Sequence, residues 1–232
     1  MKQVNVEIRK ALLSHFPNGW SFVLGVSGGR DSQVLLKSFP FVAREYGHRV
    51  ISVGINHGLR PEADSELDLA EELAGQVGTP FRRIRVEVPK EGSPQAAARD
   101  ARYAALREVA REIDGHIVTA HHSDDRAETV LIRLLRASGA GSLAVMPPTS
   151  GDVFRPMLRV SRSDIDSYAA RWKLKWADDP SNMDDHYTRV WIRQTILPAI
   201  REKFPDVDSK LNLIADDMLG VVTRLKGETG EK

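Results

Sequence analysis

The clearest chemical signal in this sequence is a pair of glycines between a short apolar run and a helical pattern. The apolar run covers residues 21–27, and the helical spacing of apolar residues begins near residue 32. Adjacent glycines allow a tight turn that brings backbone N–H groups close to an anion, and the N-terminus of the following helix adds partial positive charge. An aspartate in such a turn would repel a bare phosphate, so its presence indicates a Mg²⁺ ion beside the phosphate groups. The pattern predicts a phosphate-binding turn formed by Ser27, Gly28, Gly29, Arg30, Asp31 and Ser32.

The same string has a simpler explanation, a plain strand–helix turn in which Asp31 and Ser32 cap the helix. The complete order of residue types at this junction favours phosphate binding. On that interpretation, alanine at Gly28 or Gly29 is expected to weaken ligand binding far more than it lowers stability. The reason is that a Cβ atom would push the backbone N–H groups away from the phosphates.

A second string of chemically active residues follows a later apolar run. His121 and His122 precede Asp125 and Glu128, which share one face if a helix begins near Asp124. Two such carboxylates could hold Mg²⁺ or a substrate ammonium group, but acidic residues also favour the first turn of any helix. Spacing alone leaves both explanations open. The histidine pair lacks a third well-spaced ligand for a transition metal, so we expect hydrogen bonds to a nucleotide or substrate instead.

Two groups of arginines could bind anions. Arg99, Arg102 and Tyr103 lie in one helical pattern, where they either contact phosphates or form a solvated face. Arg189 and Arg193 are four residues apart and could stabilise negative charge on a phosphate group. Ion pairs with the acidic loop 178–185 are the alternative. Residues 126–176 carry nine Arg or Lys against four Asp or Glu, which suits either an RNA backbone or a solvated basic face.

Alternating strands and helices must position these residues. Strands are expected at 21–27, 50–56, 81–88 and 116–121, with a further edge strand near 154–158. Helices are expected between them, and Pro40 should kink or split the helix 32–46. This order predicts an α/β fold with a parallel sheet of about five strands and helices on both faces. Any ligand would then lie along the edge where the strands end.

The pattern changes after the predicted sheet. Helical spacing recurs at 162–175, 188–203 and 206–226. We therefore expect a nucleotide-binding α/β domain over 1–160 and a mostly helical extension over 161–232 that completes the site. Tryptophans in these amphipathic helices are expected to lie mainly in the core.

Composition excludes several classes of protein. The chain has 232 residues, a formal net charge of +1 and no cysteine. The lack of cysteine excludes disulfides, thiolate zinc sites, iron–sulfur clusters and cysteine nucleophiles. No apolar run is long enough to span a bilayer, and the first residues lack the apolar core of a signal peptide. We therefore expect a cytoplasmic protein without a membrane partner.

The string from Ser27 to Ser32 resembles the pyrophosphate loop of the ATP pyrophosphatase, or PP-loop, family. Members of that family cleave ATP between the α and β phosphates and adenylate a second substrate. Further strings over roughly residues 20–200 resemble, in order, the tRNA(Ile)-lysidine synthetase family. They are Asn56-His57-Gly58-Leu59-Arg60, Ala98-Arg99-Asp100-Ala101-Arg102-Tyr103, the run from His121 to Thr129, Arg155-Pro156-Met157-Leu158, Asp179-Pro180-Ser181-Asn182, and Arg189, Arg193 and Leu197-Pro198.

The resemblance implies an adenine nucleotide alpha hydrolase-like, Rossmann-like fold and a ligase that uses ATP and Mg²⁺. ATP would adenylate the C2 carbonyl oxygen of the wobble cytidine in a CAU-anticodon isoleucine tRNA. The ε-amine of free L-lysine would then displace AMP and give lysidine. The base must leave its stack to be reached.

The resemblance also implies roles for individual residues. It places ATP at the glycine turn with Asn56 and His57, and Mg²⁺ at Asp31 and Asp125. It implies catalysis by Asp31, Asp125, Glu128, Arg189 and Arg193, and contacts with tRNA or the other substrate by Arg99, Arg102, Tyr103, His121, His122 and Arg155. Because Glu128 lies one helical turn beyond Asp125, we assign Asp125 to Mg²⁺ or nucleotide and Glu128 to lysine.

Three positions depart from the pattern of that family. Arg126 stands where glutamine is usual, Val190 where asparagine is usual, and Ala137-Ser138-Gly139 where Gly-Ser-Gly is usual. These departures bear on substrate geometry rather than on the phosphate turn. Two alternatives are a tRNA thiolase, whose usual chemistry requires the cysteines that this chain lacks, and a non-catalytic nucleotide-binding module. A passive binder has no need for the acidic cluster.

Overall fold

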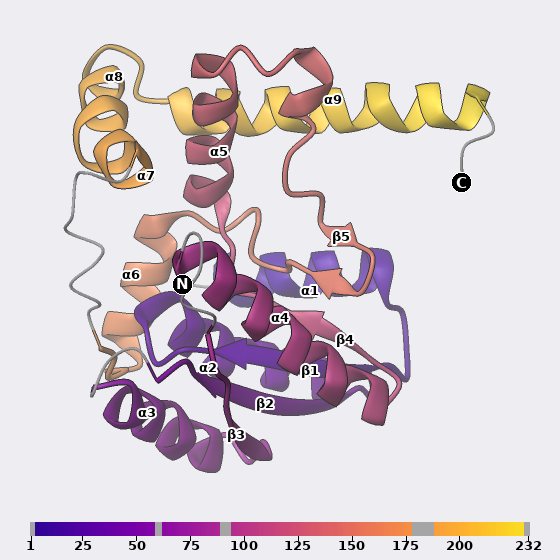
Figure 1. Cartoon of the computed structure of the whole chain (residues 1–232), viewed down its shortest axis with the longest axis vertical. Helices are drawn as coiled ribbons and strands as arrows, with labels where there is room; N and C mark the ends of the chain where they lie inside the picture. The colour runs from indigo at the N-terminus through magenta and orange to yellow at the C-terminus, as the bar shows by residue number, and fades with distance from the viewer. Residues whose placement is uncertain (1–2, 59–61, 89–93, 178–187, 230–232) are drawn as a thin grey trace.

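The computed structural model describes residues 3–58, 62–88, 94–177 and 188–229 (Figure 1). Within them a six-stranded sheet has the order β3-β2-β1-β4-β6-β5. Every pairing is parallel except that of β5 with β6. The predicted parallel α/β sheet is confirmed, with one short strand more than expected. The strands are β1 Ser21–Val26, β2 Arg49–Asn56, β3 Phe81–Arg85, β4 Gly115–Val118, β5 Thr149–Ser150 and β6 Val153–Phe154.

The strand order places a change of direction between β1 and β4. From β1 the chain adds β2 and β3 on one side, and it then crosses over to add β4 on the other side of β1. The chain therefore leaves β1 and β4 in opposite directions, and in open parallel sheets ligands usually bind at the ends of two such strands. The loops that leave β1 and β4 carry the glycine turn and the His121–His122 pair, so the topology brings the two strings together.

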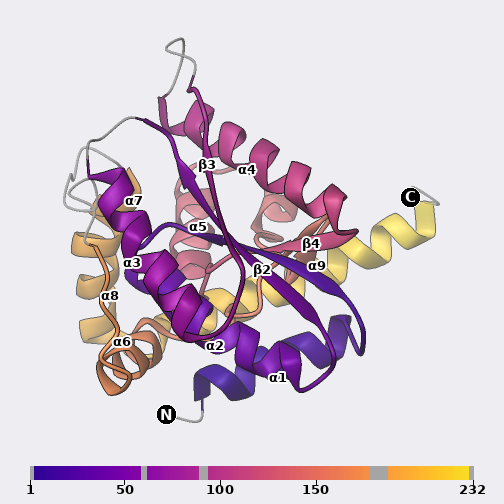
Figure 2. The same ribbon diagram turned by 90° about the horizontal axis from the view of Figure 1, so that it is seen from below.

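Helices cover both faces of the sheet (Figure 2). Phe22 and Leu24 of β1 face a core shared with α1, α2, α3 and α6, whereas Val23 faces the core formed with α4. This alternation follows from the two-residue period of a strand. The helices are α1 Gln3–His15, α2 Arg30–Arg44, α3 Ala63–Gln76, α4 Pro94–Glu112 and α6 Arg162–Arg171.

A smaller core lies beside the sheet. It joins Ala127 and Val130 of α5 to apolar residues of the later helices, including Ile192, Leu197 and Leu211. The long helix α9 crosses α5 at the top of Figure 1. The elements here are α5 Ser123–Leu135, η1 Ala140–Leu143, α7 Thr188–Trp191, η3 Ile192–Ile196, α8 Leu197–Lys203 and α9 Val207–Thr229. The domain boundary at residue 160 stays a prediction, although α6 packs into the main core.

The structure bears on three local expectations. Pro40 neither ends nor splits α2, which continues through it to Arg44. The helix expected at 188–203 is confirmed, and it contains a π-helical turn, η3, just before Pro198, which cannot donate to the carbonyl oxygen four residues earlier. Trp172 and Trp191 are 49% and 42% exposed, so neither is a core residue. Among the described helices, none has the length and apolar character needed to cross a membrane.

Arg126, one of the departures from the family pattern, attaches α9 to the rest of the molecule. Its side chain is 1% exposed, and its Nη1 lies 2.7 Å from Oδ1 of Asp216 on α9. Its Nε donates to the carbonyl oxygen of Val145. Arg159 pairs with the other oxygen of Asp216 at 2.6 Å. The departure therefore coincides with a buried ion pair between α5 and α9.

Replacing Asp216 with alanine should destabilise the protein by about 3 kcal/mol, because Arg126 would remain buried without its anion. Urea denaturation followed by circular dichroism measures the change. The control is Asp217→Ala, which removes an exposed carboxylate from the same helix and should cost less than about 0.5 kcal/mol. Equal effects of the two substitutions would contradict the assignment.

Candidate active site

The glycine turn is held by hydrogen bonds within its own string. The Ser32 hydroxyl donates to the carbonyl oxygen of Gly29 at 2.8 Å and lies 3.2 Å from the backbone nitrogen of Ser27, from which it accepts. The Ser27 hydroxyl lies 3.3 Å from the same oxygen. Gly28 adopts φ +77°, in the left-handed region that favours glycine. The structure thus uses Ser32 to shape the turn, while Gly29 is the N-cap residue of α2.

Arg30 points from the turn toward α6. Its Nη1 lies 2.6 Å from Oδ1 of Asp166, and its guanidinium carbon lies 4.8 Å from the centre of the Trp176 ring. The neighbouring Ala177 donates its N–H to the carbonyl oxygen of Gly28 at 3.1 Å. The segment that follows α6 therefore lies directly against the turn, and Arg30 helps to hold it there.

His122 is the centre of the acidic cluster. Its ring is completely buried, with Nε2 at 3.6 Å from Asp31 and 3.4 Å from Asp125, and Nδ1 at 3.5 Å from Asp124. Burial lowers the pKa of His122, but the charge of Asp125 and hydrogen bonds to Asp124 and Asp31 outweigh it and raise the pKa to about 9. The three carboxylates thus favour the charged form of the imidazole, whereas the Asp124 N–H at Nδ1 and Nη2 of Arg162 at Nε2 are donors that favour ring nitrogens with a free lone pair. The burial of His122 favours a role in positioning these carboxylates over direct contact with a tRNA base.

The neighbouring groups also shift the pKa values of the carboxylates. Burial would raise the pKa of Asp31, but the hydrogen bond and charge of His122 and the charge of Arg162 lower it. The pKa of Asp125 is lowered as well, against the effect of burial, by His122 and Arg189. Both groups are ionised at neutral pH. They stand in the first turns of α2 and α5, where the helix dipole also favours negative charge.

Arg162 is the residue that sequence reasoning missed. Its guanidinium binds both carboxylate oxygens of Asp31, with Nη2 at 3.1 Å from Oδ2, and the same Nη2 lies 3.0 Å from Nε2 of His122. Its backbone N–H donates to Asp124 at 2.9 Å, which joins the N-termini of α5 and α6. A signal was present in the sequence. A positive side chain is unfavourable at the first position of a helix, because the helix N-terminus is itself partly positive. Arg162 directly after the N-cap residue Ser161 therefore indicates an acidic partner.

Glu128 lies on the other side of Asp125 and is fully paired. Arg193 contacts both of its oxygens at 2.6 and 3.0 Å, and Nε of Arg189 lies 2.9 Å from Oε2. Arg189 also donates to Thr129, and Arg193 lies 3.5 Å from Asp125. These bonds fix α7 and η3 to α5. The predicted role of Glu128 toward lysine remains open, and an ammonium group would have to share oxygens that two arginines already contact.

Three arginines form a basic cluster at α4. Arg99 and Arg102 belong to this helix, and Arg155 is the third. The guanidinium groups of Arg99 and Arg102 lie 5.0 and 5.6 Å from the centre of the Tyr103 ring, and Arg155 donates to the carbonyl oxygen of Pro147. In the described part of the chain these three arginines have no carboxylate within ion-pair distance. The buried Tyr103 Oη, Arg155 Nε and His57 Nδ1 have no hydrogen-bond partner there either. Such a group suits an anionic ligand.

His121 lies between the acidic and basic groups. Burial, together with the charges of Arg155, Arg99 and Arg102, lowers the pKa of His121 to about 4, although Asp125 opposes the shift. The ring is therefore neutral at pH 7, and Nδ1 lies 2.8 Å from the Thr119 hydroxyl.

Asn56 has a local role at the end of β2. It donates to Asp64 at 2.6 Å and accepts from the N–H of Gly58 at 2.7 Å, which shapes the loop that carries His57. The remainder of that string, Leu59 and Arg60, lies outside the described residues, as does Asp179-Pro180-Ser181-Asn182.

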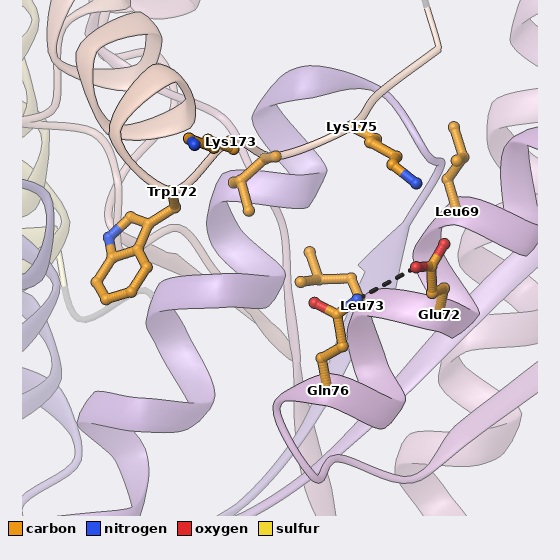
Figure 3. Close-up of a pocket in the computed structure, with 8 residues that line it drawn as sticks. Leu69, Glu72, Leu73, Gln76, Trp172, Lys173 and Lys175 are labelled. Carbon is orange, nitrogen blue, oxygen red and sulfur yellow. Dashed lines mark hydrogen bonds between the residues drawn. The ribbon is translucent and has the colours of Figure 1, made fainter.

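The predicted Mg²⁺ ligands have suitable chemistry. Asp31 and Asp125 approach the same nitrogen of His122, and Mg²⁺ is usually held by one or two carboxylates together with substrate phosphates and water. In the described residues no group of three His, Asp or Glu side chains is arranged as a ready metal site. The hollow in Figure 3 lies elsewhere, between α3 and the end of α6. It is lined by Leu69, Gln76, Trp172 and Lys175, and by none of the predicted site residues.

Comparisons with known proteins identify the family of this chain. A family model described as PP-loop domain matches residues 2–200. The tRNA(Ile)-lysidine synthase of Methylococcus capsulatus is 38% identical over 216 residues, which cover 89% of this chain and 49% of that protein. The corresponding synthase of Pseudomonas aeruginosa is 39% identical over 193 residues, covering 81% of this chain and 43% of that protein. The chain thus spans slightly less than half the length of these curated relatives.

Solved structures share the fold. The U34-tRNA thiolase NcsA from Methanococcus maripaludis, solved with its 4Fe–4S cluster, has a TM-score of 0.76 at 17% sequence identity and covers 94% of this chain and 79% of its own. NMN synthetase from Francisella tularensis has a TM-score of 0.55 at 14% identity, covering 97% of this chain and 93% of its own. At these identities the likeness concerns the fold alone.

The two glycines of the turn should respond differently to alanine. A Cβ atom on Gly28 would lie 2.2 Å from the carbonyl oxygen of Glu66, so for Gly28 the expectation of a small effect on stability was wrong. Gly29 has φ −72°, and a Cβ atom there would meet nothing closer than 3.5 Å. Gly28→Ala should therefore lower the melting temperature, whereas Gly29→Ala should leave it within about 2 °C and weaken ATP binding.

Thermal melts and calorimetry with Mg–ATP measure the two effects. If Gly29→Ala melts normally and binds ATP as tightly as the unchanged protein, the turn does not bind phosphate through this backbone.

Proposed function

Since this chain belongs to the PP-loop domain family, we propose that it uses ATP to join L-lysine to the wobble cytidine of a CAU-anticodon isoleucine tRNA. The products are lysidine, AMP and pyrophosphate. One structural observation carries the proposal. The glycine turn after β1 and the acidic loop after β4 meet at the switch point of the sheet, where Asp31 and Asp125 face the same atom of His122. A phosphate cradle with two ionised carboxylates suits nucleotidyl transfer.

In the first step the C2 carbonyl oxygen of the cytidine attacks the α-phosphate of ATP. An O–P bond forms to the base, and the bond from the α-phosphorus to the bridging oxygen breaks, so pyrophosphate leaves. The backbone of the glycine turn holds the phosphates. Asp31 and Asp125 would hold Mg²⁺, which neutralises charge on the phosphate oxygens when bound. Arg99, Arg102 and Arg155 bind phosphates of the tRNA near the extruded base.

In the second step the ε-amine of lysine attacks C2, the C2–O bond breaks, and AMP leaves. The ammonium group must first lose a proton to a carboxylate of the cluster, Asp125 or Glu128, because only the neutral amine is a nucleophile. We assign this step to the part of the cluster that contains Asp125 and Glu128. The arginines Arg189 and Arg193 lie beside them and stabilise the charge of the departing AMP. We place this activity in the cytoplasm, where tRNA, ATP and free lysine are available together.

A thiolase reaction, the chemistry named for the structural neighbour from Methanococcus maripaludis, is less favoured. That protein holds an iron–sulfur cluster, and such clusters are bound by cysteine thiolates. This chain has no cysteine. The curated relatives at 38% and 39% identity carry the lysidine synthase name instead.

ATP–pyrophosphate exchange tests the first step. We expect exchange in the presence of a CAU-anticodon isoleucine tRNA transcript and none with a transcript that carries uridine at the wobble position. Asp31→Asn should reduce the exchange rate by at least about a hundredfold, because the turn loses the charge that anchors the metal. The control Asp68→Asn removes a surface carboxylate paired with Arg83 and should leave the rate unchanged. Normal exchange by folded Asp31→Asn protein would overturn the assignment.

Glu128→Gln separates the two steps. If Glu128 serves lysine, this variant should retain part of the tRNA-dependent pyrophosphate release yet form little lysidine. Single-turnover assays that follow pyrophosphate and lysidine separately provide the comparison. A thermal melt is needed beside them, because Glu128 is buried and holds two arginines. If both products fall by the same factor, Glu128 acts in adenylation or in holding α7 and η3.

A further inference from the structure

The ion pair between Arg162 and Asp31 stands at the entrance of the predicted phosphate site. Arg162 contacts both oxygens of Asp31. Asp31 is the second residue of α2, directly after the glycine turn. The carboxylate that the proposed function requires for a metal ion is therefore already neutralised by an arginine in the protein without ligands.

The pair lies where exchange of partners is feasible. Both side chains are 32% exposed, so solvent and an incoming ligand can reach them. By contrast, Glu128 of the neighbouring pair is only 2% exposed and is enclosed by Arg189 and Arg193. Of these two carboxylates, Asp31 is therefore the one that a ligand can reach from solvent.

The backbone of Arg162 is fixed while its guanidinium stands on a long flexible stem. Ser161 and Asp164 form reciprocal hydrogen bonds that cap α6, and the Arg162 N–H donates to Asp124. These bonds keep the base of the side chain beside the site. The guanidinium fork matches two oxygens of a phosphate group as well as it matches two oxygens of a carboxylate.

A divalent cation and the Arg162 guanidinium compete for Asp31, because both are positively charged and both are held by its two oxygens. We propose that Arg162 serves as the counter-ion of Asp31 in the free protein, and that it transfers to a phosphate oxygen of ATP when a divalent cation takes its place. Arg162 is then a phosphate-binding residue of the loaded site and a competitor of the metal in the empty site. This inference rests on the proposed function, because it requires ATP and a divalent cation at the glycine turn.

The proposal predicts opposite effects on two binding constants. In Arg162→Met the stem remains but the charge is lost, so Asp31 is free. Mn²⁺ alone, measured by the loss of the free-ion electron paramagnetic resonance signal, should then bind several-fold more tightly than to the unchanged protein. Mg–ATP, measured by calorimetry at saturating Mg²⁺, should bind about tenfold more weakly, because a charge-assisted hydrogen bond to phosphate is lost.

Two further variants show where the effect arises. The double variant Arg162→Met/Asp31→Asn should lose the gain in Mn²⁺ binding. The control Arg82→Met removes an arginine paired with Glu112 on the surface and should change neither constant. If Arg162→Met does not fold, Arg162→Lys provides the same comparison. Lysine keeps the positive charge but lacks the guanidinium fork. Mn²⁺ should therefore again bind more tightly and Mg–ATP more weakly, each by a smaller factor than in Arg162→Met.

A purely structural ion pair would give a different result. Loss of such a pair lowers the melting temperature and leaves Mn²⁺ binding equal or weaker. That outcome, with Mg–ATP bound normally by the unchanged protein, would overturn the role of Arg162 and leave the proposed function standing. If the unchanged protein fails to bind Mg–ATP at all, both the inference and the proposed function are wrong.

Discussion

The imidazole of His122 is buried between the carboxylates of Asp31, Asp124 and Asp125. These carboxylates belong to the first turns of α2 and α5, and the backbone N–H of Arg162 at the start of α6 binds Asp124. Three helix N-termini thus meet at one imidazole ring. A buried carboxylate cluster without compensating groups would be strongly repulsive, so the contacts of the His122 ring and of Arg162 with these carboxylates are the constraint on which the geometry of the site depends.

Around His122, some arginines are paired with carboxylates and others are not, and the two kinds lie on different segments of the chain. Arg162 neutralises Asp31 on one side, and Arg189 and Arg193 neutralise Glu128 on the other. The arginines on the side of α4 differ because they have no carboxylate among the described residues. The basic residues therefore fall into two groups. One group binds carboxylates of the site, and the other has no carboxylate partner among the described residues and suits an anionic ligand. An adenylation reaction on RNA needs both kinds, since ATP and tRNA each bring phosphates to a site built on carboxylates.

Much of this arrangement followed from short-range patterns in the sequence. The order of strands and helices, the glycine turn after β1 and the placement of Asp125 and Glu128 one turn apart on the same helix all depend on residues close to one another in the chain. The contacts that could not be predicted join distant segments. Arg162 meets Asp31 across 131 positions, and Gly28 lies against the carbonyl of Glu66. The sequence shows that Arg126 is unusual for the family. It does not show that Asp216 is its partner, because that contact arises only from the packing of α9 against α5. The exposure of Trp172 and Trp191 likewise reflects packing that periodicity does not specify.

The most direct test of this account is the chemical fate of the wobble cytidine. An unmodified CAU-anticodon isoleucine tRNA is incubated with the protein, ATP, Mg²⁺ and isotopically labelled L-lysine, and the digested nucleosides are analysed by mass spectrometry. The account predicts that the cytidine is replaced by a nucleoside heavier by lysine minus water, which carries the label and requires ATP. Unchanged cytidine after incubation with folded, ATP-binding protein, or a modification that contains no lysine label, would contradict it.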